Sequence, residues 1–292
     1  VRLQDEPIAD PVCVPVYFVS KLARDSGVIV CQVGEGADEL FCGYPGWKTL
    51  LKLQGLNDLP VPGRLKKLGL AALRAVGRSE KFYYEWLRRA SDGQPVFWGG
   101  AEAFSEAQKN RLLSPRLRRR FRHRTSWDAI EGVHARYHDR ARSPSHLGWM
   151  SYLDLNFRLP ELLLMRVDKM SMGASLEARV PFLDHKLVEL AMGVPDALKL
   201  KNGTLKYILK ESVRGLLPTT IVDRRKQGFG VPVYEWFFDK LGARAHEEIE
   251  RFCRDTDVLD PQAVRRLETE GRSQQLWYLM NLAMWWRQYV AV

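Results

Sequence analysis

VIVCQV at residues 28–33, followed directly by GEGADELF at residues 34–41, is the part of this sequence that is most informative about its fold. A β-branched apolar run bounded by glycines predicts a strand that is buried on both faces. Apolar residues at helical spacing over 11–24 predict a helix before it, which ends at Gly27. No other stretch shows so clear a strand pattern. Because one strand cannot form a sheet, we expect the remaining strands to lie outside this sequence.

The turn after this strand carries the first candidate functional side chains. Ligands of open α/β sheets bind at the carboxyl ends of the strands, and Gly34 and Gly36 would let the backbone approach a phosphate closely. Three nearby carboxylates would repel a bare phosphate unless a divalent cation such as Mg²⁺ lies between them. They are Glu35, Asp38 and Glu39. An ordinary turn, whose acids complement the helix dipole, explains the same pattern, and the residues alone leave both readings open.

Composition divides the chain into three regions, 1–45, 46–145 and 146–292. The first holds the strand and its loop. The second is rich in leucine, arginine and proline and predicts several short amphipathic helices, whereas the third predicts more apolar helices. Prolines are expected to break the third region at Pro160 and Pro181. Its C-terminal helices are expected over 234–254 and 274–289. The fold class predicted is a mostly helical part of an α/β fold.

Positive charge is concentrated in one short segment. The chain has 45 Lys+Arg against 35 Asp+Glu, a net charge of +10. Six arginines lie close together in the second region: Arg116, Arg118, Arg119, Arg120, Arg122 and Arg124. Such a run indicates either a polyanion site or a solvated helix face. We favour the solvated face, and expect no nucleic-acid partner, because no nucleic-acid-binding motif accompanies the run.

Composition also excludes several classes of protein. With 46% hydrophobic and 27% charged residues, the chain is not expected to be disordered. Its four cysteines form no C-x-x-C pair, which argues against a zinc ribbon or a thioredoxin-type site and suits a reducing, cytoplasmic compartment. No apolar run approaches 18 residues, so we expect no membrane-spanning helix, and the first residues lack the apolar core of a signal peptide.

Two further segments combine charged residues with apolar or flexible neighbours. Residues 159–184 contain Arg166, Asp168, Lys169, Glu177, Arg179 and Asp184. Buried charges must be paired, so a structural ion-pair network is the simpler interpretation for Glu177 and Arg179, and Met170 and Met172 are expected in the core. Residues 224–232 read RRKQGFGVP and predict a mobile basic loop. That loop is either a solvated surface loop or a cationic clamp on phosphate.

Together these segments resemble the synthetase domain of glutamine-hydrolysing asparagine synthetases. The resemblance is carried by DEPIADP at 5–11, GEGADELF at 34–41, RVPFLD at 179–184 and the basic loop at 224–232, in this order. It extends over nearly the whole chain, is weakest over 46–145, and is greatest to the longer bacterial branch. It implies an adenine-nucleotide α-hydrolase-like, or PP-loop, fold with a helical insert.

The resemblance also implies a reaction. The β-carboxylate of aspartate attacks the α-phosphorus of ATP, pyrophosphate leaves with Mg²⁺, and ammonia then displaces AMP from the β-aspartyl-AMP intermediate. Asp38 matches the family's Mg²⁺-pyrophosphate carboxylate, Glu35 the glutamate linked to proton removal from ammonia, and Lys226 the lysine that stabilises charge at the acyl phosphate. The resemblance also implies that Val33, Gly34 and Gly36 contact ATP. Less specifically, it implies that Arg166, Asp168 and Asp184 line the substrate pocket.

The sequence departs from the family pattern in several places. Val33 replaces a serine and Cys42 replaces a glycine, which could crowd the turn. The family's pyrophosphate loop, Ser-Gly-Gly-x-Asp-Ser, does not occur, and neither does the N-terminal glutaminase domain that supplies ammonia from glutamine. We therefore expect the chain to be the C-terminal part of a longer synthetase, inactive when isolated.

Three alternatives remain open. The family also resembles ATP-dependent enzymes that activate other carboxylates, such as lactam synthetases. A non-catalytic helical interaction module would explain the departures at Val33 and Cys42, and nucleic-acid binding has only the arginine run in its favour. A homodimer is compatible with the sequence but is not indicated by it.

Overall fold

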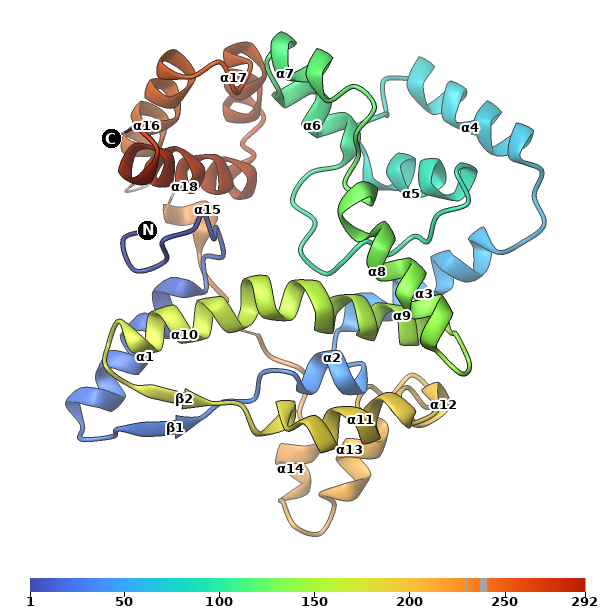
Figure 1. Cartoon of the computed structure of the whole chain (residues 1–292), viewed down its shortest axis with the longest axis vertical. Coiled ribbons are helices and arrows are strands. Elements are labelled where there is room, and N and C mark those ends of the chain that lie inside the picture. Colours follow the sequence, from blue (N-terminus) through green and yellow to red (C-terminus); the bar gives the residue numbers. More distant parts are fainter. Residues whose placement is uncertain (229, 237–240, 292) are drawn as a thin grey trace.

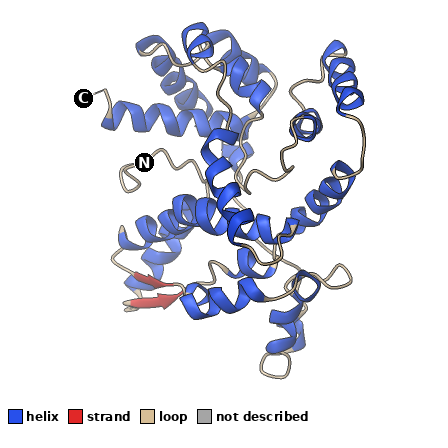
Figure 2. Ribbon diagram, turned by 45° about the vertical axis from the view of Figure 1, so that its right-hand side comes forward, coloured by secondary structure: helices blue, strands red, loops and turns tan. Residues whose placement is uncertain are grey.

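The computed structural model describes residues 1–228, 230–236 and 241–291. Helices make up most of this part of the chain, and two short strands form one small parallel sheet (Figures 1 and 2). None of the helices within the described ranges combines the length and the apolar character that a bilayer crossing requires. The predicted mostly helical composition is therefore confirmed for these residues.

The strand predicted over 28–33 is present, but it is shorter and more exposed than expected. β1 covers Val30–Gln32 and pairs in parallel with β2, Glu177–Arg179. The expectation that no partner strand lies in this sequence is therefore wrong. Val28 and Ile29 are 39% and 64% exposed, and Val30 itself is 42% exposed. Burial on both faces is also wrong, because Val30 and Gln32 are exposed and only Cys31 between them is partly buried.

A long composite helix runs through the middle of the molecule (Figure 1). It consists of α9 (His146–Leu153), a π-helical stretch η1 (Asp154–Leu164) and α10 (Met165–Met172). The predicted break at Pro160 is wrong, because the chain continues as a helix through the proline. The wider i→i+5 register of a π-helix relieves the clash and the missing hydrogen bond that a proline causes in an α-helix.

The first helix packs against the end of this composite helix. The predicted helix over 11–24 is confirmed as α1 (Cys13–Asp25), and the chain turns at Gly27 with a φ of 87°. Ile8, Cys13 and Met170 form a small buried cluster where α1 meets α10. Met172, however, is 53% exposed, so its predicted place in the core is wrong. α10 also packs against β2, the strand that pairs with β1.

The region 46–145 forms several short helices, as predicted. They are α3 (Pro45–Asn57), α4 (Gly63–Ala75), α5 (Phe82–Ser91), α6 (Glu106–Leu112), α7 (Pro115–Arg120) and α8 (Trp127–Arg140). The arginine run starts in α7 and is exposed, as expected for a solvated face. Arg116 lies 2.6 Å from Asp257, and Arg118 lies 3.6 Å from Asp260. The boundaries of the three regions stay a prediction.

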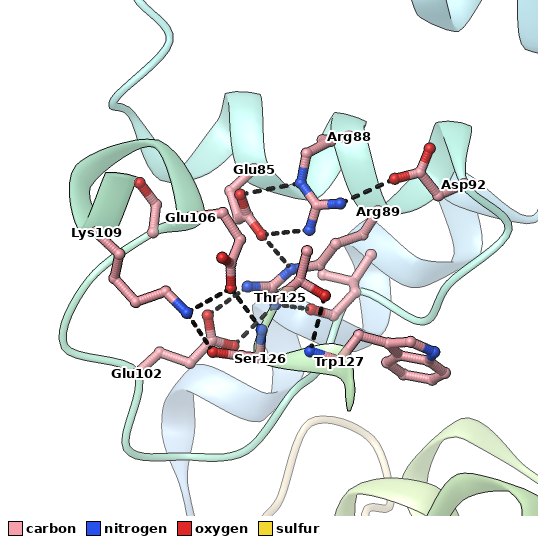
Figure 3. Close-up of polar contacts among 12 residues, drawn as sticks. Glu85, Arg88, Arg89, Asp92, Glu102, Glu106, Lys109, Thr125, Ser126 and Trp127 are labelled. Carbon is pink, nitrogen blue, oxygen red and sulfur yellow. Dashed lines mark hydrogen bonds and ion pairs between the residues drawn. The ribbon is translucent and has the colours of Figure 1, made fainter. Parts of the chain in front are cut away.

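A buried ion cluster holds this helical region together (Figure 3). Arg89 is 2% exposed, and its guanidinium donates to Glu85 at 3.0 Å and to Glu102 at 2.6 Å. It also donates to the carbonyl of Val96 at 2.7 Å and lies 4.0 Å from the ring centroid of Trp98. Because a buried charge is costly unless it is paired, this cluster fixes α5 against the loop before α6.

The remaining helices of the described chain form two groups, which lie above and below the composite helix in Figure 1. They are α2 (Ala37–Phe41), α11 (His185–Gly193), α12 (Asp196–Lys199), α13 (Tyr207–Ser212), α14 (Thr219–Val222), α15 (Val233–Trp236), α16 (Gly242–Asp255), α17 (Pro261–Thr269) and α18 (Ser273–Tyr289). The predicted boundary at Pro181 is confirmed, because β2 ends before the 3₁₀ turn η2 (Pro181–Leu183). The helix predicted over 274–289 is confirmed as α18. Of the helix predicted over 234–254, residues 237–240 lie outside the described residues.

Candidate functional site

The turn that follows β1 is fixed by contacts on both sides. The N–H of Val33 donates to the carbonyl of Arg179 at 2.8 Å, which continues the strand pairing by one residue. Gly36 has a φ of 92° and starts α2. A Cβ at Gly36 would lie 2.4 Å from Leu183 Cδ2, so a larger residue would clash as well as being strained. Gly34 is exposed and has open space around it. The backbone of this turn is thus accessible at Gly34 and tightly packed at Gly36.

Each of the three carboxylates of the turn has its own partners. Glu35 accepts a hydrogen bond from Arg166 at 2.9 Å. Asp38 contacts two lysines, and Glu39 is buried and accepts a hydrogen bond from the hydroxyl of Tyr44. In the described part of the chain, no group of three or more His, Cys, Asp or Glu side chains is placed to hold a metal ion. The metal-binding role of Asp38, which needs only one or two carboxylates together with phosphate oxygens, stays a prediction.

Asp38 lies between two ammonium groups. Its Oδ1 lies 2.7 Å from Nζ of Lys206, and its Oδ2 lies 2.5 Å from Nζ of Lys226. Burial by itself would raise the pKa of Asp38, but the hydrogen bonds and charges of the two lysines outweigh it and hold the pKa below its usual range. The carboxylate is consequently ionised at neutral pH, and the pair of lysines gives the cluster a net positive charge.

The close approach of Lys206 to Asp38 requires a small residue beside them. A Cβ at Gly43 would lie 1.8 Å from Asp38 Oδ1 and 2.3 Å from Lys206 Cε. Cys42, which departs from the family pattern, is fully buried and has a φ of 59°. This left-handed conformation is costly for a residue with a side chain, which explains why a glycine suits the position.

No feature of the sequence indicates that Lys206 belongs to the site. It lies in a stretch without a recognisable motif, 168 positions after Asp38, and only the tertiary fold brings the two together. Its backbone also has a positive φ of 54°, and its N–H donates to the carbonyl of Phe41 at 3.2 Å, beside the turn that carries Asp38. Sequence reasoning missed this residue because a contact of this kind depends on no local pattern.

A cationic cavity opens next to this cluster. Its volume is about 550 Å³, which is in the range of small-molecule sites. It is lined by six cationic side chains and one carboxylate: Lys48, Lys206, Lys210, Arg224, Arg225, Lys226 and Asp223. Residues 223–228 form an exposed loop, as predicted for the basic segment, and Phe229 lies outside the described residues. The excess of positive charge suits a polyanionic ligand.

Arg166 connects the turn to the start of the chain. It is 8% exposed, and its guanidinium donates to Asp10 at 2.6 Å and to Glu35 at 2.9 Å. The structure therefore brings Glu35 and Arg166 together. Asp168 is exposed on α10, and Asp184 is exposed and caps α11 by accepting the N–H of Lys186 at 2.9 Å. Within the described ranges, neither aspartate shares an ion pair with the side chains that hold Asp38 and Glu35.

The charged pair of β2 does not belong to a buried network. Glu177 and Arg179 lie 3.6 Å apart, with 51% and 67% of their side chains exposed. The predicted pairing is confirmed, but the predicted burial is wrong, because β2 lies at the surface beside the exposed β1 (Figure 2). Among the charged residues of 166–184, Arg166 is the buried one.

Comparison with known proteins gives a consistent result. The family model for asparagine synthase matches residues 1–287. The chain is 32% identical over 286 residues to asparagine synthetase (glutamine-hydrolyzing) 1 of Bacillus subtilis, covering 96% of this chain and 44% of that protein. It is 31% identical over 300 residues to a putative asparagine synthetase (glutamine-hydrolyzing) of Mycobacterium tuberculosis, covering 96% and 42%. To amidase chyE of Penicillium rubens it is 26% identical over 264 residues, covering 82% and 37%.

The match extends over nearly all of this chain, whereas the chain spans less than half the length of the curated relatives. The resemblance that the motifs at 34–41 and 179–184 indicated is therefore confirmed by the family model over residues 1–287. The chain belongs to the asparagine synthase family.

Proposed function

We propose that this chain carries the pyrophosphate side of an ATP-dependent amide ligase that converts aspartate to asparagine. The cluster of Asp38, Lys206 and Lys226 beside a cavity lined by six cations is the observation that supports this proposal most directly. An adenylation step releases pyrophosphate, and a pocket for that anion needs several fixed positive charges.

The reaction proceeds in two steps. A β-carboxylate oxygen of aspartate attacks the α-phosphorus of ATP, and the bond from that phosphorus to the bridging oxygen breaks, so that pyrophosphate leaves. Ammonia then attacks the carbonyl carbon of β-aspartyl-AMP, loses a proton, and AMP leaves with its oxygen. Lys226 would stabilise negative charge at the acyl phosphate, and Glu35 would accept the proton from ammonia. Val33, Gly34 and Gly36 would contact the nucleotide, and Arg166, Asp168 and Asp184 are the candidates for the aspartate pocket.

Asp38 fits a site for Mg²⁺ in one respect. It is an ionised carboxylate beside the cationic cavity, and Mg²⁺ in such enzymes is bound by one or two carboxylates together with phosphate oxygens. Bound there with pyrophosphate, the ion would neutralise part of the charge of the leaving group. The two lysines contact both oxygens of Asp38, so one of them has to move when Asp38 binds a cation.

The complete gene product is the material for testing this function. We expect it to catalyse aspartate-dependent exchange between pyrophosphate and ATP, and to form asparagine with ammonia. If exchange depends on another carboxylic acid and not on aspartate, the adenylation chemistry is supported but the substrate is that other acid. No exchange with any acid, in a protein that folds, would contradict the proposal.

The isolated 292-residue chain is expected to be inactive. Neither the loop Ser-Gly-Gly-x-Asp-Ser nor a glutaminase nucleophile at an N-terminal cysteine occurs in its sequence. By similarity to the glutamine-hydrolysing relatives, ammonia would come from glutamine through a separate glutaminase domain. Ammonia-dependent AMP production by the isolated chain would refute this expectation.

A further inference from the structure

Tyr44 stands beside the candidate catalytic lysine without taking part in the proposed chemistry. Nζ of Lys226 lies 5.9 Å from the centroid of the Tyr44 ring, which is within the range of a cation–π interaction. The hydroxyl of Tyr44 donates to the buried Glu39. Burial, followed by the charge of Glu39, raises the pKa of Tyr44, so the ring stays a neutral phenol.

A second cation holds the same ring. Cζ of Arg158 lies 4.6 Å from the Tyr44 centroid, and its Nη1 lies 3.2 Å from Oδ2 of Asp154. Asp154 is fully buried and accepts the N–H of Gly100 at 3.0 Å. A Cβ at Gly100 would lie 2.4 Å from Arg158 Nη1 and 2.9 Å from Asp154 Oδ2. Arg158 is thus fixed by the composite helix and by a glycine of the helical region 46–145.

Lys226 itself is held at its ammonium group. It lies in the loop over 224–228, whose residues are all exposed, and 36% of its side chain is exposed. Asp38 and the ring of Tyr44 are the two groups that hold the ammonium among the described residues. When Asp38 binds a cation in place of Lys226, the ring remains to keep the ammonium group near the cavity.

We propose that Tyr44 is a positioning residue for Lys226, and that Arg158 keeps the ring in the orientation that Lys226 needs. The importance of this contact for catalysis rests on the proposed function, whereas the contact itself does not. Glu39 and Arg158 restrict the ring from two sides, so its face is preorganised before any ligand binds. The effect is expected on the rate of the step that Lys226 assists rather than on the binding of ATP.

The contact can be tested without enzymatic activity. Protons above an aromatic face resonate upfield, so the ε-methylene protons of Lys226 should be shifted upfield in an NMR spectrum of the ¹³C-lysine-labelled chain, with Lys226→Arg to assign the signal. We expect Tyr44→Phe to retain most of this shift, because Arg158 still holds the ring although the hydrogen bond to Glu39 is lost, and Tyr44→Leu to abolish it. An unshifted Lys226 signal in the wild-type chain would overturn the proposal.

A second variant covers the case in which Tyr44→Leu does not fold. Arg158→Lys keeps the positive charge near Asp154 but loses the planar group that stacks on the ring, so the Lys226 signal should move toward its ordinary position. Circular dichroism and thermal melting establish that each variant is folded. If the Lys226 signal keeps its wild-type position in the folded Tyr44→Leu and Arg158→Lys variants, the proposed roles of the ring and of Arg158 are contradicted.

The catalytic consequence is measured in the complete gene product. We expect Tyr44→Leu to lower kcat of pyrophosphate exchange about tenfold, as loss of a partly desolvated cation–π contact would, while KM for ATP changes less than about twofold. Tyr44→Phe should restore most of the rate. If the wild-type protein shows no exchange, the proposed function fails while the NMR result still decides the contact. A normal kcat in a folded Tyr44→Leu variant would overturn the positioning role.

Discussion

Nζ of Lys226 lies 2.5 Å from Oδ2 of Asp38, although 188 positions separate the two residues in the sequence. Lys206 approaches the other oxygen of the same carboxylate at 2.7 Å. The single negative charge of Asp38 therefore neutralises only one of these two lysines, and both lysines line the cavity. A ligand with several negative charges would be attracted by the second cation, and a divalent cation bound at Asp38 would displace at least one of the lysines toward that ligand. The first two of the following predictions test this cluster directly.

Lys226→Ala is expected to abolish adenylation in the complete gene product. Loss of one donor that stabilises developing negative charge typically raises the barrier by about 3–4 kcal/mol. Aspartate-dependent ATP–pyrophosphate exchange measures the effect. Lys21→Ala is the control, because Lys21 is an exposed lysine paired with Asp25 on α1 and should leave exchange unchanged. Near-normal exchange by Lys226→Ala would remove the assignment of this residue.

Asp38→Asn is expected to remove the dependence of pyrophosphate binding on Mg²⁺. The neutral amide is a weaker ligand for Mg²⁺ than a carboxylate, whereas Lys206 and Lys226 stay available for the anion. Calorimetric titration of the chain with pyrophosphate, with and without Mg²⁺, measures this difference. Asp223→Asn changes a carboxylate that lines the same cavity and pairs with Arg214, so it should keep the Mg²⁺ dependence. An equal dependence on Mg²⁺ in both variants would count against Asp38 as a ligand.

Arg166→Met is expected to destabilise the fold by about 3 kcal/mol. The substitution leaves the carboxylates of Asp10 and Glu35 without their shared partner, and breaking one side of a buried ion pair costs about 3–5 kcal/mol, less where the partners are partly exposed. Urea denaturation of the chain measures the free energy of unfolding. Arg179→Met is the matched control, since its pair with Glu177 is exposed and should change stability by less than about 0.5 kcal/mol.

The parts of the fold that the sequence predicts are those with a strong local pattern. β-branched residues over 28–33 indicate β1, and helical spacing indicates α1 and α18. β2 has no such pattern, because Glu177-Ala178-Arg179 contains no β-branched or aromatic residue and owes its conformation to pairing with β1. Pro160 misled the prediction for a different reason, since a π-helical register tolerates a residue that an α-helix excludes.

For the candidate site, motifs in the sequence identify the residues but not their partners. Asp38 and Lys226 match a family pattern, and the structure places them in contact. Lys206 could not be found in this way, because its closeness to Asp38 depends on the packing of α13 beside α2. The negative charge of Glu39 did not indicate its role either. Glu39 is buried and bonded to Tyr44, so it does not act together with the other carboxylates of the turn.

Asp154→Asn is expected to gain stability relative to the wild-type chain as the pH rises. Burial raises the pKa of Asp154 from 3.8 to about 6, and the contacts with Arg158 and Gly100 offset this only in part. A raised pKa means that the folded state binds the proton more tightly than the unfolded state. The contribution of protonated Asp154 to the free energy of unfolding is therefore fully present below about pH 4 and is lost as the pH rises through about 6.

The loss between pH 4 and pH 8 should amount to about 2 kcal/mol in the wild-type chain, since a tenfold difference in proton affinity between the folded and unfolded states corresponds to about 1.4 kcal/mol. The asparagine variant has no proton to lose, so the difference in free energy of unfolding between the two proteins should move in its favour by that amount. Urea denaturation at pH 4, 6 and 8 measures it, with Asp25→Asn at an exposed site as the control for removal of a charge. A difference that stays constant with pH would show that Asp154 keeps its ordinary acidity, and that Arg158 compensates its burial in full.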